Sequence, residues 1–238
     1  GVGCAVHAGA KLYFRAPDGT QTELCADVNE AFSQSFTMKG VLYLMDGKTY
    51  RAVRKSSKNT AWEAVSVSGT AYVPTTTISA APTGGGTSYE AVNLLTPKRI
   101  NTFIGDGTAT QFKVDATDLD ETAVTAEVNG SAVTVSAVNR STGLVTLAAA
   151  PANGNGLANV SIAFAKTVSG HADKINKCRF AGLYGGKNDT RVFLSGNPDE
   201  PDCDWQSGLY DPTYFPDTGY TRMGTDASAI RILSVKKL

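Results

Sequence analysis

Short runs that alternate between apolar and polar side chains, each followed by a tight turn, recur along this chain of 238 residues. Residues 11–15 alternate in this way before a Pro-Asp-Gly turn, and residues 40–44 precede an Asp-Gly turn. A period of two places every second side chain on one face of a strand, and Asp-Gly favours hairpins. The chain is rich in glycine, with 24 residues, and it lacks long periodic stretches of Ala, Leu, Glu and Lys. We therefore predict an all-β fold.

A Leu-Tyr pair recurs within these runs, at residues 12–13, 42–43 and 183–184. Recurring hairpins are typical of stacked blades, and ordinary unrelated hairpins are the alternative. We expect a β-propeller-like body, partial or complete, made from residues 1–97 and 168–238. Within its first part, residues 27–36 predict one short helix. Residues 74–97 are rich in Pro and Gly and predict a connector.

Residues 98–167 predict a separate module. Asn129-Gly130 separates the alternating runs 126–128 and 132–135, and Asn-Gly is the strongest short hairpin signal because a type I′ turn needs positive φ at both central residues. Further alternating runs follow at regular spacing. This pattern predicts a small Ig-like β-sandwich inserted into the body.

Charge and hydropathy limit the classes of partner. Lys+Arg and Asp+Glu balance at 22 each, so net charge gives no reason to bind nucleic acid or an anionic membrane. The longest apolar runs, such as residues 41–45, are far shorter than a membrane span of ~20 residues. The first residues lack the basic start and apolar stretch of a signal peptide. The chain begins with Gly rather than Met, which fits an internal or processed piece.

Catalytic and metal-binding motifs are missing from the sequence. The two histidines, His7 and His171, lie outside any nucleophile-elbow motif, and we expect His171 in a solvent-facing loop. The glycines at 84–86 are not followed by the Lys of a phosphate-binding loop. We therefore predict that the chain is not an enzyme and holds no metal or cofactor.

The four cysteines, at positions 4, 25, 178 and 203, form no C-x-x-C pair. Disulfides joining 4 to 25 or 178 to 203 are one alternative. Reduced, partly buried thiols are favoured, because a chain of this length does not need disulfides for stability.

Acidic and aromatic residues gather with prolines between residues 196 and 217. Proline is excluded from central strands, so we predict a surface loop with its aromatic side chains packed inward. The alternatives are a Ca²⁺ site for the acids and sugar stacking for the aromatics. The predicted interaction loop contains Asp199, Glu200, Asp202, Asp204, Trp205, Tyr210, Tyr214 and Phe215.

A basic segment without intervening acids forms a second candidate surface. It could meet the acidic loop of a neighbouring subunit, line a DNA-conducting channel, or discourage aggregation at a sheet edge. The predicted basic patch contains Lys48, Arg51, Arg54, Lys55 and Lys58.

Several segments resemble structural proteins of phages and prophages of Gram-positive gut bacteria. They are RVFLSGNPD at 191–199, DWQSGLYDPTYFPDTGY at 204–220, GTDASAI at 224–230, YVPTTTIS at 72–79, TGGGT at 83–87 and VNLLTPKRIN at 92–101. The module at 98–167 is similar to Ig-like additions in virion proteins.

This resemblance implies a tail or tail-hub protein of the virion, propeller-like, whose partners are other copies of itself and other virion proteins. No catalytic residues come with the resemblance. The chain ends soon after Ile230, whereas a full propeller needs at least four four-stranded blades, so a partial propeller is expected. The alternative function is a carbohydrate-binding adhesin or receptor-binding module that takes a host surface glycan.

Overall fold

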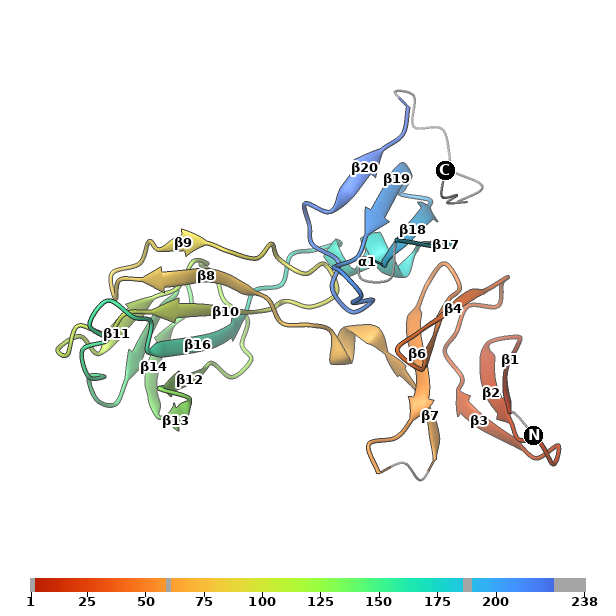
Figure 1. The fold of residues 1–238 in the computed structure, drawn as a ribbon, viewed down its shortest axis with the longest axis horizontal. Coiled ribbons are helices and arrows are strands. Elements are labelled where there is room, and N and C mark those ends of the chain that lie inside the picture. Colours follow the sequence, from red (N-terminus) through yellow and green to blue (C-terminus); the bar gives the residue numbers. More distant parts are fainter. Residues whose placement is uncertain (1–2, 59–60, 186–189, 225–238) are drawn as a thin grey trace. The chain divides into compact units, whose positions relative to one another are not determined.

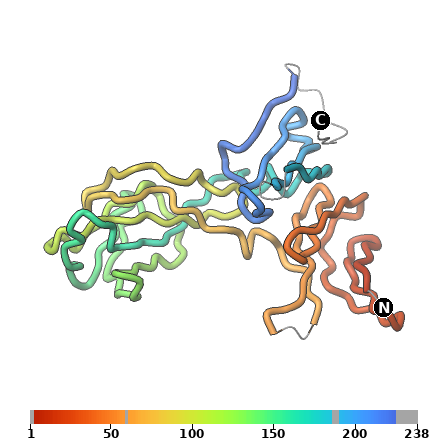
Figure 2. Tube along the Cα trace, viewed as in Figure 1, coloured from red at the N-terminus to blue at the C-terminus, as the bar shows by residue number. Residues whose placement is uncertain are grey.

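The computed structural model describes residues 3–58, 61–185 and 190–224 (Figures 1 and 2). The fold is all-β, as predicted, and the helices in this part of the chain are the short α1 (His171–Asn176) and the 3₁₀ helix η1 (Val67–Thr70). The chain divides into two compact units. The sandwich unit is the continuous segment Tyr72–Ser169, and the stacked unit combines Gly1–Ala71 with Gly170–Leu238, so that it takes both ends of the colour scale in Figure 2.

The stacked unit contains three antiparallel sheets, in each of which consecutive strands are neighbours. The turn chemistry explains this order, because each tight turn returns the chain beside the strand that it has just left. The predicted hairpins starting at residues 11, 40 and 183 are confirmed. The first sheet is β1 (Cys4–Ala8), β2 (Lys11–Arg15) and β3 (Gln21–Cys25); the second is β4 (Gln34–Met38), β5 (Val41–Met45), β6 (Tyr50–Lys55) and β7 (Trp62–Ser66); the third is β17 (Phe180–Tyr184), β18 (Arg191–Asn197), β19 (Glu200–Gln206) and β20 (Tyr220–Arg222).

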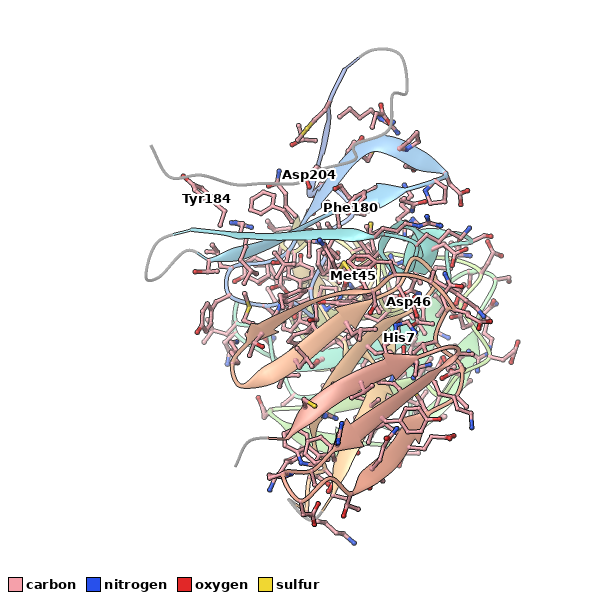
Figure 3. The ribbon with its side chains drawn as sticks, turned by 90° about the vertical axis from the view of Figure 1, so that its right-hand side faces the viewer. His7, Met45, Asp46, Phe180, Tyr184 and Asp204 are labelled. Carbon is pink, nitrogen blue, oxygen red and sulfur yellow. The ribbon has the colours of Figure 1, made fainter. Side chains whose placement is uncertain are left out.

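The second sheet of the stacked unit lies between the other two (Figure 3). On one face, Leu44 packs in a buried cluster with Leu12 of the first sheet. On the other face, the Tyr50 hydroxyl donates a 3.0 Å hydrogen bond to the carbonyl of Pro212. Tyr50 lies opposite Met45 on the neighbouring strand, so these two side chains share a face. Leu44 precedes Met45 in β5, and its side chain therefore points to the other face. The second sheet is therefore covered on one face by the first sheet and on the other by the segment that joins β19 to β20.

The helix predicted over residues 27–36 is wrong. Residues 26–33 are irregular, and the remainder belongs to β4. The reason is a long-range contact. The Asn29 N–H donates to the Asp46 carboxylate at 2.7 Å, and the Asn29 side chain donates to the Asp46 carbonyl at 2.9 Å. Tertiary contacts of this kind override a weak local preference for helix.

The sandwich unit has two sheets that enclose one core. The Phe103 and Phe112 rings, one from each sheet, meet edge-on with centroids 5.4 Å apart, and the surrounding buried cluster draws on both sheets. The six-stranded sheet has the order β13 (Ser131–Val133), β12 (Thr125–Val128), β16 (Val160–Ala165), β10 (Lys98–Phe103), β8 (Thr75–Ala80) and β9 (Thr87–Ser88), and the three-stranded sheet has the order β11 (Gln111–Lys113), β15 (Leu144–Leu147) and β14 (Val135–Asn139).

The start of the sandwich unit differs from the prediction. Residues 74–97, expected to be a connector, contribute β8 and β9, and β8 pairs in parallel with β10. The compact unit accordingly begins at Tyr72 rather than at residue 98. The predicted hairpin at 129–130 is confirmed, with φ of 52° at Asn129 and 76° at Gly130.

The segment around Pro201 is a strand in the stacked unit, not the predicted loop. β19 pairs with both β18 and β20 and is therefore a central strand. Its pairing with β18 moves from Ser195 opposite Asp204 to Asn197 opposite Glu200, so Pro201 lies in a bulge. A residue in a bulge does not have to donate a backbone hydrogen bond to the neighbouring strand. A central strand therefore tolerates proline at this position.

Candidate functional site

The acids of the predicted interaction loop are separated by the strand that carries them. Asp199 accepts from Lys177 at 2.6 Å, and Asp202 pairs with Arg222 at 2.7 Å. Glu200 also contacts Arg222, at 2.5 Å. Hydrogen bonds that Lys177 donates to its carboxylate partners, first Asp199 and then Asp173, raise the pKa of Lys177. These three acids therefore hold α1 and β20 against β19, and their charges are balanced locally.

Asp204, the fourth acid, is buried. It is 3% exposed and stands directly opposite the fully buried Ser195, in the third sheet where Figure 3 labels it. Among the described residues, neither Asp204 Oδ1 nor the Ser195 hydroxyl has a hydrogen-bond partner. Burial raises the pKa of Asp204 to about 6, because a charged carboxylate is poorly solvated there. Asp204 is thus a protonatable core group rather than a surface acid.

The aromatic residues of the same segment also differ in burial. Trp205 and Phe215 are buried, as the inward-packing prediction required. The ammonium of Lys174 lies 5.0 Å from the centroid of the Trp205 ring, and Phe215 packs edge-on against Tyr50. Tyr214 is half-buried, whereas Tyr210 is exposed. The predicted interaction loop is therefore not one continuous surface.

The predicted basic patch is likewise divided. Arg51 and Arg54 are three residues apart on β6 and so project from opposite faces. Arg51 is largely buried and pairs with Asp27, and Arg54 pairs with Glu63 at 3.0 Å. The Lys55 ammonium lies 6.0 Å from the Trp62 ring centroid, and Lys48 and Lys58 are exposed. Acids distant in sequence thus neutralise the two arginines, which leaves little support for a DNA-lining stripe.

The two histidines occupy different settings. His171 begins α1 instead of lying in a loop. His7 Nδ1 lies 3.0 Å from the Ser33 hydroxyl, a contact that a nucleophile and base would make. A catalytic triad also needs a carboxylate on the other ring nitrogen. His7 Nε2 is buried without a hydrogen-bond partner among the described residues, so this pair lacks the third member.

The cysteines are free thiols, as favoured from the sequence. Cys178 and Cys203 are buried in the stacked unit, and Cys4 is exposed. Burial raises the pKa of Cys203 to about 11 and that of Cys178 still further. Both thiols are therefore protonated and unreactive at neutral pH.

A pocket on the sandwich unit, here called the polar pocket because several polar side chains line it, is a candidate site that sequence reasoning missed. Its volume is about 410 Å³, and it lies between the glycine loop after β8 and the segment that follows β11. The only sequence signal was the run of glycines at 84–86, which we considered and rejected as a phosphate loop. The polar pocket is lined by Thr77, Ala80, Thr83, Gly84, Gly85, Asn101, Lys113, Val114, Asp115, Ala116 and Thr117.

One carboxylate, on the exposed residue Asp115, is the centre of a hydrogen-bond network at the polar pocket. Asp115 Oδ2 accepts hydrogen bonds from the hydroxyls of Thr76 and Thr77, at 2.5 and 2.8 Å, and from the Asn101 amide at 2.9 Å. The side-chain Oδ1 of Asn101 in turn accepts the Asp115 N–H at 2.8 Å. Two other chain segments, residues 76–77 and Asn101, therefore fix this side chain.

No group of three or more His, Cys, Asp or Glu residues in the described ranges is placed to hold a metal ion. Within those ranges, no helix has the length and hydropathy to cross a membrane. Comparisons with protein-family models, with curated proteins and with solved structures found no match for this chain.

Proposed function

We propose that this chain is a structural component of a bacteriophage particle, in the tail or tail hub, and that it works through contacts with other copies of itself and with other virion proteins. The resemblance of residues 72–101 and 191–230 to phage structural proteins suggests the particle. The observation that carries the mechanism is the stack of three meander sheets in the stacked unit. Sheets packed on both faces form a stiff body whose surfaces have fixed positions.

The stack has the features expected of a partial β-propeller. Propeller blades are four-stranded antiparallel meanders, and the second and third sheets have this form. The outer face of the first sheet is polar along β2 and β3, where Tyr13 pairs with Glu23 and Glu23 forms a 2.7 Å ion pair with Lys11. A polar outer face suits the end of a stack. The sandwich unit would then be the Ig-like insert of this body.

Exposed apolar side chains at one end of the third sheet support the subunit contact. Leu183 and Tyr184 end β17, and Tyr184 pairs with Arg191. The Tyr210 N–H donates to the carbonyl of Thr190 at 2.7 Å, which brings Leu209 and Tyr210 to the same end of the third sheet. These four side chains are between 40% and 54% exposed. Exposed apolar clusters mark interaction sites, and Tyr is enriched in them. We propose that a second copy of the chain binds here.

Two measurements test this proposal. Light scattering on the full chain should show association that Leu183→Asp combined with Leu209→Asp abolishes, whereas Leu157→Asp, at an exposed leucine of the sandwich unit, leaves it unchanged. Mass spectrometry of particles purified from the bacterium that encodes the chain should detect it. A chain that stays monomeric at every concentration, or that is missing from the particles, contradicts the assembly role.

The alternative function, a carbohydrate-binding adhesin or receptor-binding module, is favoured by one specific observation, the polar pocket of the sandwich unit. Such binding is compatible with a place in a phage particle.

A further inference from the structure

We propose that the polar pocket of the sandwich unit binds an uncharged saccharide unit, with Asp115 and Lys113 as its main hydrogen-bonding residues. This inference deepens the carbohydrate-binding alternative and does not depend on the assembly role. The pocket volume of about 410 Å³ falls within the range of roughly 300–1,000 Å³ that is usual for small-molecule sites.

Asp115 is oriented before any ligand arrives. Its Oδ2 atom already accepts hydrogen bonds from Thr76, Thr77 and Asn101. Asn101 is 1% exposed, so the frame that holds the carboxylate is itself part of the core. Within the described residues, Asp115 Oδ1 accepts no hydrogen bond. A carboxylate fixed through one oxygen keeps the other as an acceptor for a ligand hydroxyl.

Lys113 also lines the polar pocket and lies beside the glycine loop. Its N–H donates to the Pro82 carbonyl at 2.8 Å. A β-carbon added at Gly84 would lie 3.2 Å from Lys113 Cγ. The aliphatic part of the Lys113 side chain therefore packs against the backbone of Gly84. Gly84 and Gly85 have φ of 104° and 82°, which other residues rarely adopt. Among the described residues, the Lys113 ammonium forms no ion pair and is available as a donor.

The mixture of charges selects the ligand class. Phosphate would meet the Asp115 carboxylate, and a cation would meet the Lys113 ammonium, so one of the two groups repels each kind of ion. A sugar hydroxyl donates to a carboxylate and accepts from an ammonium, which satisfies both groups at once. The hydroxyls of Thr83 and Thr117 add further partners of the same kind at the wall. No aromatic residue lines the pocket, so recognition would rest on hydrogen bonds rather than on stacking.

The test uses the full chain on an array of bacterial surface and cell-wall saccharides, followed by calorimetric titration with the saccharide that binds best. Lys113→Met and Asp115→Asn should each weaken binding at least about tenfold, the usual effect of losing a hydrogen bond to a charged group. Lys98→Met is the matched control, because Lys98 is an exposed lysine of the same unit outside the polar pocket. Circular dichroism confirms that each variant is folded.

Failure of every saccharide to bind would overturn the proposal, and so would wild-type affinity in Lys113→Met. Lys113 takes no part in the Asp115 network, so this variant remains decisive even if Asp115→Asn disturbs folding. An equal loss in Lys98→Met would also overturn it, because the binding surface would then lie elsewhere. None of these outcomes bears on light scattering or particle composition, so the assembly role is tested separately.

Discussion

The two compact units use similar short strands but bury them differently. The sandwich unit is one continuous segment, and its single core lies between two sheets around Phe103 and Phe112. The stacked unit brings together two segments separated by the whole sandwich unit. Its third sheet buries the Ser195 hydroxyl and Asp204 Oδ1 without hydrogen-bond partners in the described part of the chain. Bringing those two segments together closes a long loop, whose entropy must be lost before their contacts form. The comparison indicates that the sandwich unit is self-sufficient, whereas the stacked unit depends on long-range closure and contains an internal electrostatic cost.

The largest expected effect tests whether the units unfold independently. Phe103→Ala should lower the stability of the sandwich unit by about 3–5 kcal/mol, because it leaves a cavity in a fully buried core. Both tryptophans, Trp62 and Trp205, belong to the stacked unit. Denaturation followed by circular dichroism should therefore show an early transition, while tryptophan fluorescence remains unchanged.

Leu157→Ala is the control for this experiment, since Leu157 is 75% exposed in the same unit and should move neither signal. If Phe103→Ala shifts the fluorescence transition as far as the dichroism transition, the chain unfolds as one cooperative body and the proposed independence of the units is wrong.

The second effect concerns the buried acid of the stacked unit. The pKa of Asp204 is raised from 3.8 to about 6 in the folded protein, so the folded state binds more protons than the unfolded state between these values. Stability should fall as the pH rises from about 4 to about 6, and it should stay lower above. Asp204→Asn removes the titrating group and should stabilise the stacked unit at pH 8 by on the order of 2–3 kcal/mol.

Tryptophan fluorescence during urea denaturation measures this effect directly, because Trp205 neighbours Asp204 on β19. At pH 3.5, where the wild-type carboxyl is also neutral, the two proteins should have nearly equal stability. Asp199→Asn, at an exposed acid, provides the comparison. A variant that is less stable than the wild type at pH 8 would mean that the charged form has a partner and that the burial argument fails.

Sequence patterns predict the turns and hairpins of both units. They fail where contacts between residues distant in sequence determine the structure. The turn at Asn129-Gly130 and the hairpin around Asp46-Gly47 were predictable, because each follows from the backbone preferences of neighbouring residues. The strand at Pro201 was not predictable from its composition. It exists because a bulge against β18 spares the proline, and the position of a bulge depends on the partner strand.

The candidate sites depend even more than the fold on contacts between residues distant in sequence, and the sequence therefore predicts them less well. Runs of charge on one segment suggested a basic patch, but the acids that neutralise Arg51 and Arg54 come from elsewhere in the chain. The polar pocket needs Asn101 and Asp115 together with the loop at residues 83–85, and each is unremarkable in isolation. The parallel pairing of β8 with β10 brings them together, and no turn signal in the sequence indicates such a pairing.

A pair of matched glycine substitutions sharpens the comparison with a smaller effect. Gly40, between β4 and β5, and Gly130, between β12 and β13, have φ of 75° and 76°, and a β-carbon at either would meet no atom within 4 Å. Alanine should therefore cost only the strain of left-handed backbone, roughly 1–2 kcal/mol. Gly40→Ala should shift the fluorescence transition, and Gly130→Ala only the dichroism transition. Identical shifts in both signals for both variants would show that the units are coupled.

The smallest effect is expected at the surface ion pair of the first sheet. Lys11 and Glu23 are 2.7 Å apart, but about half of each side chain is exposed, and hydrogen bonding to Glu23 raises the pKa of Lys11. Water and salt screen such a pair, so Lys11→Met should slightly lower the fluorescence transition at low ionic strength and leave it unchanged in 0.5 M salt, a concentration at which the Debye length is only about 4 Å. Loss of stability that persists in high salt would indicate that the polar outer face of this sheet is covered in solution. The argument for the end of a stack would then fail, because a covered face implies a further subunit or sheet against it.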